Sequence, residues 1–368
     1  MITISLCMIV KNEVETLNRC LESVKDIPDE IIIVDTGSTD RTKQIASKWT
    51  KQILDFKWID DFSAARNYSF HQASMDYILW LDADDILLPE ERKKLLDLKQ
   101  SLTQKIDAVS MIYHAEIDKF NNVLTSIRRN RLVKRSKNFQ WHGVVHEDLS
   151  IHDQYNSLES DIIVTHKKNY ADNESDRNLK LYEQFLKKNK GKMTVHDIFH
   201  YARELHKHKK YKQAIEFYNK FLDYEDIRLE HRIFVMHKLA SCYHLIGNFK
   251  KEIEITFQSL EYDVPQPEFS CRLGEFFLKN NQFSQAVYWY NQAIEAPSAN
   301  STHFIEQQPF KTWLPHKQLA FCYFQLKDYK QTNYHNKMVL RFLPTDEETL
   351  NNIKVIEELM MTDYHSFE

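Results

Sequence analysis

The first 90 residues alternate between short apolar runs and segments whose apolar positions recur at helical spacing. Apolar runs at residues 3–10, 30–34 and 77–81, and a shorter one at 51–56, predict buried strands. Behind the first run, one helical face carries Leu17, Cys20, Leu21 and Val24. Repeated alternation of strand and helix predicts a parallel α/β sheet, in which ligands bind at the carboxyl ends of the strands.

Later runs at 108–113, 127–134 and 162–166 predict further strands, so the sheet becomes mixed. Capping-box spacing indicates two helix starts, at Asn12 with Glu15 and at Thr345 with Glu348. We therefore predict a helix soon after the first strand and a terminal helix from Thr345 to about Met360.

The second half has no strand pattern and contains a repeat. Nine positions after each of the small residues Ala202, Ala240, Gly274 and Ala320 stands an aromatic residue: Tyr211, Phe249, Phe283 and Tyr329. The aromatic positions are 38, 34 and 46 apart, taken as differences of their numbers. The middle value is the tetratricopeptide period, and the other two require insertions. We expect an α/β domain at residues 1–190, followed by an all-α domain of tetratricopeptide-like repeats at 191–368.

Composition narrows the class of protein. A chain of 368 residues with 42% hydrophobic and 28% charged positions is typical of a soluble globular protein with two domains. The net charge of -4 makes nucleic acid an unexpected partner. The apolar run near the N-terminus is interrupted at Lys11, so we expect no signal peptide, no membrane span and a cytoplasmic location. Five scattered cysteines without a C-x-x-C pair indicate reduced core thiols.

Glycine is scarce, which excludes two kinds of nucleotide site. Only five glycines occur, and their spacing allows neither a G-x-G-x-x-G turn nor a Walker loop. A nucleotide bound here would therefore need carboxylates and a metal ion to hold its phosphates. Asp82 and Asp84 follow a buried strand, and their oxygens favour Mg²⁺ or Mn²⁺. The alternative is an acidic helix cap before Pro89.

Four motifs in order resemble one family. They are Met8-Ile-Val-Lys-Asn-Glu13, Val34-Asp-Thr-Gly-Ser-Thr-Asp40, Phe62-Ser-Ala-Ala-Arg-Asn67 and Trp80-Leu-Asp-Ala-Asp84. Residues 1 to about 180 resemble the family 2 glycosyltransferases of the GT-A fold, a Rossmann-like, mostly parallel sheet. The resemblance implies transfer from a nucleotide-sugar with inversion at the anomeric carbon, and a divalent metal ion on the diphosphate.

The same resemblance assigns site residues. Asp35 looks like the acid that meets the nucleoside base, and Arg66 is similar to the arginine that faces the diphosphate. The positions expected to bind the donor are Val10, Lys11, Asn12, Glu13, Asp35, Gly37, Ser38, Arg66, Asp82, Ala83 and Asp84. The expected metal ligands are Asp84, Asp82 and, by similarity to tandem-repeat glycosyltransferases, His166. For the 35–40 segment, the alternative is a plain strand-to-helix turn.

The segment from Phe139 to Asp148 is dense in groups that transfer protons. A nucleophilic acceptor must lose a proton as it attacks, so one base near the sugar is required. We predict Glu147 as that base, with Asp148 and then His146 as alternatives, unless all three only cap the next element. The basic cluster at 128–131 is predicted to lie on a solvated strand edge rather than at the diphosphate or acceptor.

The leading hypothesis is an inverting, metal-dependent glycosyltransferase that moves a hexosyl or N-acetylhexosaminyl group from a UDP-sugar to a peptide or protein side chain. The pairing of domains resembles bacterial peptide and protein glycosyltransferases. The repeats would recruit the acceptor or form a homodimer. The alternatives are a surface-polysaccharide or lipid-linked glycan as acceptor, a sugar-phosphate nucleotidyltransferase, and a repeat scaffold fused to a domain that has lost activity. The motifs specify neither the sugar nor the linkage atom.

Overall fold

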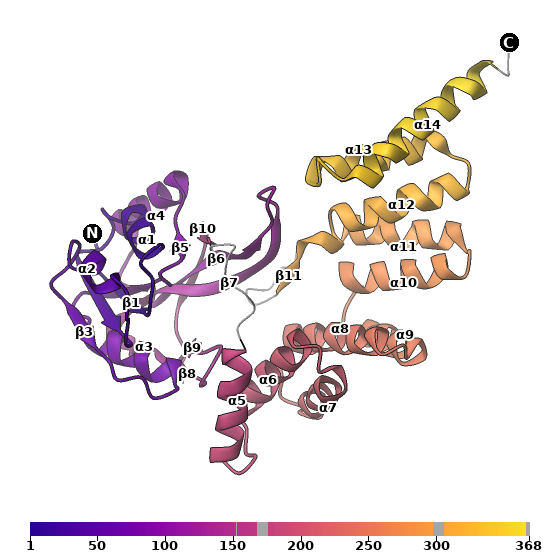
Figure 1. The fold of residues 1–368 in the computed structure, drawn as a ribbon. Coiled ribbons are helices and arrows are strands. Elements are labelled where there is room, and N and C mark those ends of the chain that lie inside the picture. Colours follow the sequence, from indigo (N-terminus) through magenta and orange to yellow (C-terminus); the bar gives the residue numbers. More distant parts are fainter. Residues whose placement is uncertain (152, 168–175, 297–304, 366–368) are drawn as a thin grey trace. The chain divides into compact units, whose positions relative to one another are not determined.

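The computed structural model describes residues 1–151, 153–167, 176–296 and 305–365, and side chains as far as residue 361. The chain folds into two compact units (Figure 1). The first comprises residues 1–116 and 127–208, and the second comprises residues 117–126 and 209–368. The first unit continues as far as His208, beyond residue 190 where the sequence placed the domain boundary, and that boundary stays a prediction.

The first unit is built on a mixed sheet with the strand order β3-β2-β1-β4-β7-β6-β10-β5. The first four, which are parallel, are β3 (Ile53–Asp55), β2 (Glu30–Asp35), β1 (Ile4–Val10) and β4 (Tyr77–Trp80). The others are β7 (Val123–Lys134), β6 (Ala108–Ile117), β10 (Ser157–His166) and β5 (Asp85–Ile86). Strand β7 runs antiparallel to β4, so the mixed α/β sheet predicted from the apolar runs is confirmed.

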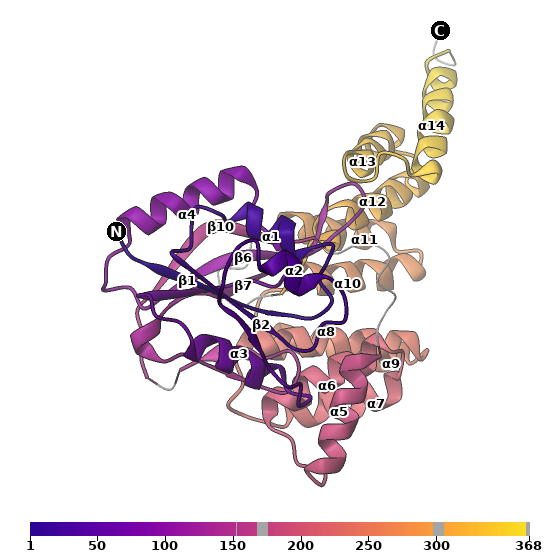
Figure 2. The ribbon, with the colours of Figure 1, turned by 60° about the vertical axis from the view of Figure 1, so that its left-hand side comes forward.

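Helices cover both faces of this sheet (Figure 2). They are α1 (Leu17–Ser23), α2 (Thr42–Ala46), α3 (Phe62–His71) and α4 (Pro89–Ser101). One core cluster joins β1 to α1 and α4, and a second packs β2 and β4 against α3 and a small ribbon. That ribbon pairs β8 (Gln140–His142) with β9 (Asp148–Ser150). All five cysteines are buried and free, as predicted.

Two helices that follow the sheet in sequence belong to the first unit. They are α5 (Arg177–Lys188) and α6 (Val195–Lys207). The hydroxyl of buried Tyr182, on α5, donates a hydrogen bond of 2.9 Å to the carbonyl oxygen of Val145. Thr194 and Asp197 form a capping box at the start of α6. This first unit therefore extends into the region where the sequence predicted only repeats.

The second unit consists mainly of helices arranged in antiparallel pairs (Figure 1). In chain order they are α7 (Tyr211–Leu222), α8 (Leu229–Leu245), α9 (Phe249–Gln258), α10 (Pro267–Lys279), α11 (Phe283–Glu295), α12 (Trp313–Gln325), α13 (Tyr329–Phe342) and α14 (Glu347–His365). Each aromatic residue of the repeat is the first residue of a helix. A Cβ added at Gly274 would lie 2.8 Å from the ring of Tyr290, so the small residue lets α10 approach α11.

The second unit also holds the tip between β6 and β7, which the sequence did not predict. The side-chain amide of Asn122 donates a hydrogen bond of 2.5 Å to the carbonyl oxygen of Phe342. Strand β11 (Glu306–Gln307) pairs antiparallel with Thr125 and Ser126. A sequence pattern shows no such pairing, because it depends on residues about 180 positions apart.

Both predicted capping boxes are wrong in detail. Helix α1 begins at Leu17 rather than near Asn12, whose backbone has a positive φ of 56°. At the terminal helix the cap comes from Asp346, whose carboxylate accepts hydrogen bonds from the backbone and hydroxyl of Thr349. Helix α1 has no side-chain cap, and the terminal helix is capped by a residue one position later than predicted, which spacing alone does not distinguish.

Candidate active site

A cavity of about 480 Å³ opens at the carboxyl ends of β1 and β4, within the first unit. The predicted site residues that line it are Val10, Lys11, Glu13, Arg66, Asp82, Ala83, Asp84, His146, Glu147 and His166. Five predicted positions lie outside this lining as the described residues form it: Asn12, Asp35, Gly37, Ser38 and Asp148. The lining also includes residues that the sequence did not single out for this site, among them Trp80, Tyr113, Trp141 and Arg177.

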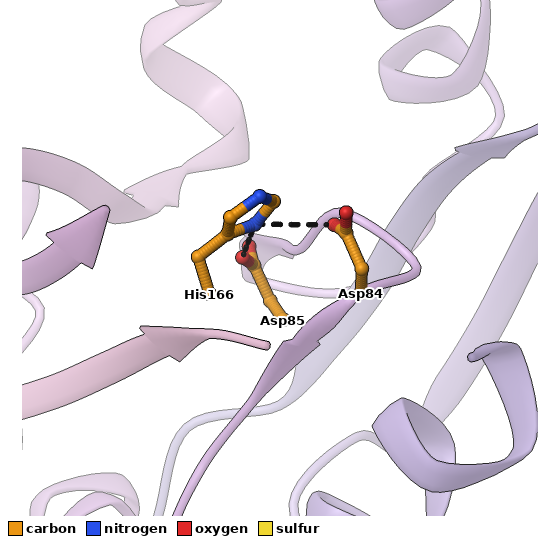
Figure 3. A group of neighbouring side chains, drawn as sticks. All are labelled: Asp84, Asp85 and His166. Carbon is orange, nitrogen blue, oxygen red and sulfur yellow. Dashed lines mark ion pairs between the residues drawn. The ribbon is translucent and has the colours of Figure 1, made fainter. Parts of the chain in front are cut away.

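Two carboxylates and one imidazole meet at the end of β4 (Figure 3). Nδ1 of His166, the last residue of β10, lies 3.3 Å from Oδ1 of Asp84 and 3.5 Å from Oδ1 of Asp85. The pairing of His166 with Asp85 between β10 and β5 brings them together. Burial lowers the pKa of His166, but the two carboxylates outweigh it and raise the pKa to about 10.

This group fits a divalent metal ion. One ligand atom from each of Asp84, Asp85 and His166 lies within 4.8 Å of the others. Oδ1 of Asp85 and Nδ1 of His166 are buried and make no hydrogen bond to any described residue. Carboxylate oxygens and an imidazole nitrogen are suitable ligands for Mn²⁺. Asp85 was absent from the predicted metal ligands, and Asp82, which was among them, lies outside this group.

Asp82 instead pairs with Arg66. The guanidinium Nη2 lies 2.6 Å from Oδ1 of Asp82, and its Nε donates a hydrogen bond of 2.5 Å to Oε1 of Glu147. Burial raises the pKa of Asp82, but the charges of Arg66 and Arg131 outweigh burial and lower it to about 2. Arg66 therefore bridges one residue of the Asp-x-Asp loop and the predicted base.

Two tryptophans hold this arginine in place. The guanidinium carbon of Arg66 lies 5.2 Å from the ring centre of Trp80 and 4.9 Å from that of Trp141, both within cation–π range. Asn67, the next residue on α3, exchanges two hydrogen bonds with the backbone of Trp141. The F-S-A-A-R-N motif thus fixes α3 and the ribbon together so that the arginine points into the cavity.

Arg131 corrects the prediction for the basic cluster. Its side chain is 0% exposed and lies 3.0 Å from Oδ2 of Asp85. Its guanidinium carbon lies 3.8 Å from the ring centre of Trp80 and 4.5 Å from that of Tyr113. The expected solvated strand edge is wrong here because β7 runs through the middle of the sheet, so this face of the strand is covered. Arg129, two positions earlier, lines the cavity.

The segment after β2 is held by its own polar residues. Oδ1 of Asp35 accepts hydrogen bonds from the backbone nitrogens of Gly37 and Ser38, at 2.9 and 2.8 Å. Oδ2 of Asp35 is buried and has no hydrogen-bond partner within the part of the chain that the structure describes. The side-chain oxygen of Asn12 accepts from the backbone nitrogen of Thr39 at 2.8 Å. These contacts join the loops after β1 and β2.

The predicted proton-transfer segment separates into three environments. Asp148 begins β9 and is exposed. The side chain of Glu147 is 10% exposed and pairs with Arg66. His146 has a positive φ of 56°, and its Nε2 lies 2.6 Å from Oε1 of Glu204 on α6. The sequence reasoning missed Glu204, although its spacing of four from His200 and of eight from His196 was a signal for one helical face.

Comparisons with known proteins agree with the motifs. The sequence model of the family "Glycosyl transferase family 2" matches residues 5–155. Residues 5–155 are therefore similar to a family 2 glycosyltransferase domain, and the resemblance to family 2 enzymes with tetratricopeptide repeats is confirmed. The fold, an α/β domain with a mixed sheet followed along the chain by a helical domain, agrees with the predicted fold class.

Two curated relatives are similar over part of their length. A TPR repeat-containing protein of Synechococcus elongatus is 50% identical over 105 residues, which cover 28% of this chain and 26% of the relative. The SPbeta prophage-derived glycosyltransferase SunS of Bacillus subtilis is 30% identical over 233 residues, which cover 60% of this chain and 53% of SunS. The chain thus spans about a quarter and about half of these relatives.

Among solved structures, glucosyl-3-phosphoglycerate synthase from Mycobacterium tuberculosis, in complex with Mg²⁺ and UDP, is 23% identical with a TM-score of 0.27. The match covers 30% of this chain and 44% of that one. The TPR protein YrrB is 14% identical with a TM-score of 0.36 and covers 49% of this chain and 84% of that one.

Among the described residues, no helix is both long and apolar enough to cross a bilayer.

Proposed function

We propose that the chain is an inverting, metal-dependent glycosyltransferase that uses a UDP-sugar. The observation that carries the proposal is a shared cavity lined by residues from all four family motifs, with Asp84 and Arg66 on its wall and His146 and Glu147 beside them. Donor, leaving group and acceptor base need to share one such space.

Asp84, Asp85 and His166 would hold the metal ion. Bound there, Mn²⁺ or Mg²⁺ would supply positive charge to the diphosphate of the donor. Arg131 holds Oδ2 of Asp85, so Oδ1, which has no hydrogen-bond partner among the described residues, is the oxygen that Asp85 would offer the metal. The neutral form of His166 is the metal ligand, so binding requires loss of the proton that the two carboxylates favour.

The leaving nucleoside diphosphate gains negative charge as the bond to the sugar breaks. Arg66 and Arg129 line the cavity, and the lysine of the first motif, Lys11, lies on the same wall. These cations would stabilise that charge where it develops, which makes a general acid unnecessary. Oδ2 of Asp35 is buried without a hydrogen-bond partner among the described residues, and it would accept a hydrogen bond from the nucleoside base next to Thr36, which lines the cavity.

We propose a peptide or protein side chain as the acceptor. The support is the pairing of a family 2 domain with helical repeats, together with the resemblance to SunS, a protein named as a glycosyltransferase. Helical repeats present extended surfaces suited to peptides, or to a second copy of the chain. The acceptor determines whether the linkage atom is oxygen, sulfur or nitrogen. The shape of the loops around the donor determines which sugar is transferred.

The test incubates the protein with UDP-glucose or UDP-N-acetylglucosamine and Mn²⁺ and measures products. We expect slow release of UDP with water as acceptor, and calorimetric binding of UDP that depends on Mn²⁺. Asp84→Asn should abolish that dependence, whereas Asp97→Asn, at an exposed position on α4, should not. Formation of pyrophosphate from a sugar phosphate and UTP would instead identify a nucleotidyltransferase, and metal-independent UDP binding by the wild-type protein would contradict the proposed site.

A further inference from the structure

His146 has a partner that the family motifs do not include. The residue lines the cavity, and its Nε2 lies 2.6 Å from Oε1 of Glu204. Glu204 stands on α6, beyond the residues 5–155 that match the family model. Its side chain is only 5% exposed. A buried carboxylate facing one ring nitrogen of a cavity-lining histidine is the arrangement that orients a histidine base.

Histidine and glutamate side chains on one face of α6 surround the contact between His146 and Glu204. His196, His200, Glu204 and His208 follow one another at intervals of four and therefore lie along one side of the helix. The ring of His200 stacks on that of His146, with centroids 5.0 Å apart and planes 19° apart. Nε2 of His208 lies 3.6 Å from Oε2 of Glu204. The contacts fix both the plane of the His146 ring and the carboxylate beneath it.

The charge of Glu204 decides which nitrogen of His146 carries the proton. Burial raises the pKa of Glu204, but its hydrogen bond to His146 and the charge of that residue outweigh burial and lower it. An ionised carboxylate only accepts hydrogen bonds, so neutral His146 must donate from Nε2. Nδ1 is then the ring nitrogen that can accept a proton.

The surrounding groups do not cancel this polarity. Burial, together with the positive groups around it, holds the pKa of His200 well below its usual range, so the stacked ring is neutral. The charged and titratable groups that the structure places around the pair are Glu147, Asp148, Asp176, Asp197, Tyr182, His196, His200, Arg129, Arg203, Lys207 and His208, with Asn178 as a further hydrogen-bond donor to Glu204.

Glu147, the base predicted from the sequence, is engaged elsewhere. Its Oε1 accepts from Nε of Arg66, and the side chains of both residues are 10% exposed. Taking up a proton at Glu147 would leave that buried guanidinium facing one carboxylate in place of two. Glu147 is therefore better suited to hold Arg66 at the diphosphate than to receive the proton of the acceptor.

Resting on the proposed function, we propose that His146 is the catalytic base and that Glu204 is its positioning residue. As the acceptor's oxygen, sulfur or nitrogen forms its bond to the anomeric carbon, its proton passes to Nδ1 of His146. The bond from that carbon to the diphosphate breaks, and its electron pair leaves with the UDP. The carboxylate of Glu204 stabilises the resulting imidazolium.

The test follows UDP release from UDP-glucose and from UDP-N-acetylglucosamine with Mn²⁺, with water as acceptor, between pH 5 and 9. Glu204→Gln keeps a hydrogen-bond acceptor but removes the charge. We expect unchanged UDP affinity, a turnover lowered at least tenfold or so, and an acidic limb of the rate profile moved about one pH unit lower. Glu216→Gln, at an exposed position on α7, should match the wild type in all three respects.

Two further measurements do not depend on the folding of that variant. In ¹⁵N spectra of the wild-type protein, His146 should be protonated at Nε2. Added imidazole should restore UDP release to His146→Ala but not to Glu147→Gln. Any one of three results overturns the dyad alone. Folded Glu204→Gln could release UDP with the acidic limb of its rate profile unmoved, His146 could be protonated at Nδ1, or imidazole could fail to restore UDP release to His146→Ala. No UDP release by the wild-type protein with either donor overturns the proposed function, and the dyad with it.

Discussion

The buried ion pair between Arg131 and Asp85 offers a quantitative test of how the site is supported. Both side chains are 0% exposed, and the guanidinium Nη1 lies 3.0 Å from Oδ2 of Asp85. Arg131→Met keeps much of the side-chain volume and the contact with Trp80 but removes the cation at Oδ2 of Asp85, so the buried carboxylate keeps only His166, 3.5 Å from its Oδ1. Such a change separates the charge from the packing.

The expected loss follows from burial. Removing one partner of a buried pair costs about 3–5 kcal/mol, since the remaining charge stays out of water. Arg128→Met is a matched control on the same strand, because Arg128 is half-buried and donates to the carbonyl oxygen of Ser160 at 2.6 Å. Loss of that hydrogen bond should cost about 1 kcal/mol. The two variants should therefore differ by at least about 2 kcal/mol.

Hydrogen–deuterium exchange of the β4 and β7 amides measures this locally, which avoids assuming that both units unfold together. At about 1.4 kcal/mol per factor of ten, we expect exchange in Arg131→Met to speed up by a factor of about 10² or more, and in Arg128→Met about fivefold. Combining Arg131→Met with Asp85→Asn should cost less than the sum of the single changes by about 0.5–3 kcal/mol. Strictly additive losses, or equal effects of Arg131→Met and Arg128→Met, would refute the reasoning.

Three further outcomes are expected. His166 has a pKa of about 10 without metal, so Mn²⁺ must displace a proton when it binds. The affinity of the protein for Mn²⁺, measured by calorimetry, should therefore rise about tenfold per pH unit between pH 6 and 8. An affinity that does not change with pH would argue against His166 as a ligand. Asp82 has a pKa of about 2, below its usual value, so it contributes stability above about pH 4 that is lost as the pH falls toward 2. Asp82→Asn should therefore flatten the dependence of the free energy of unfolding on pH in that range. An unchanged slope would count against the pair with Arg66. Gly274→Ala places a Cβ 2.8 Å from the Tyr290 ring, so the repeats should lose about 1–3 kcal/mol of stability. The midpoint of their thermal unfolding should therefore fall, and an unchanged midpoint would mean that α10 and α11 can separate freely.

Local patterns were sufficient for the elements and for the approximate place of the site. Apolar runs predicted seven strands of the sheet but not β5 or β11, and the aromatic positions of the repeat each begin a helix. Asp84 and His166 line one cavity because each follows or ends a strand whose carboxyl end lies at the same edge of the sheet, and Arg66 reaches that cavity from α3. Such features depend on neighbours in the chain, so they can be read without knowing distant contacts.

What surrounds those residues was decided only by the tertiary structure. The sequence predicted a solvated edge for the basic cluster, but β7 inserts between β4 and β6 and buries Arg131 against Asp85. It predicted a helix cap at Asn12, which instead joins two loops. The metal group and the partner of His146 likewise pair residues tens of positions apart. The sequence determined which groups were available, whereas pairing across the sheet and the placement of α6 decided their charge, burial and orientation, because those properties depend on contacts that no local pattern encodes.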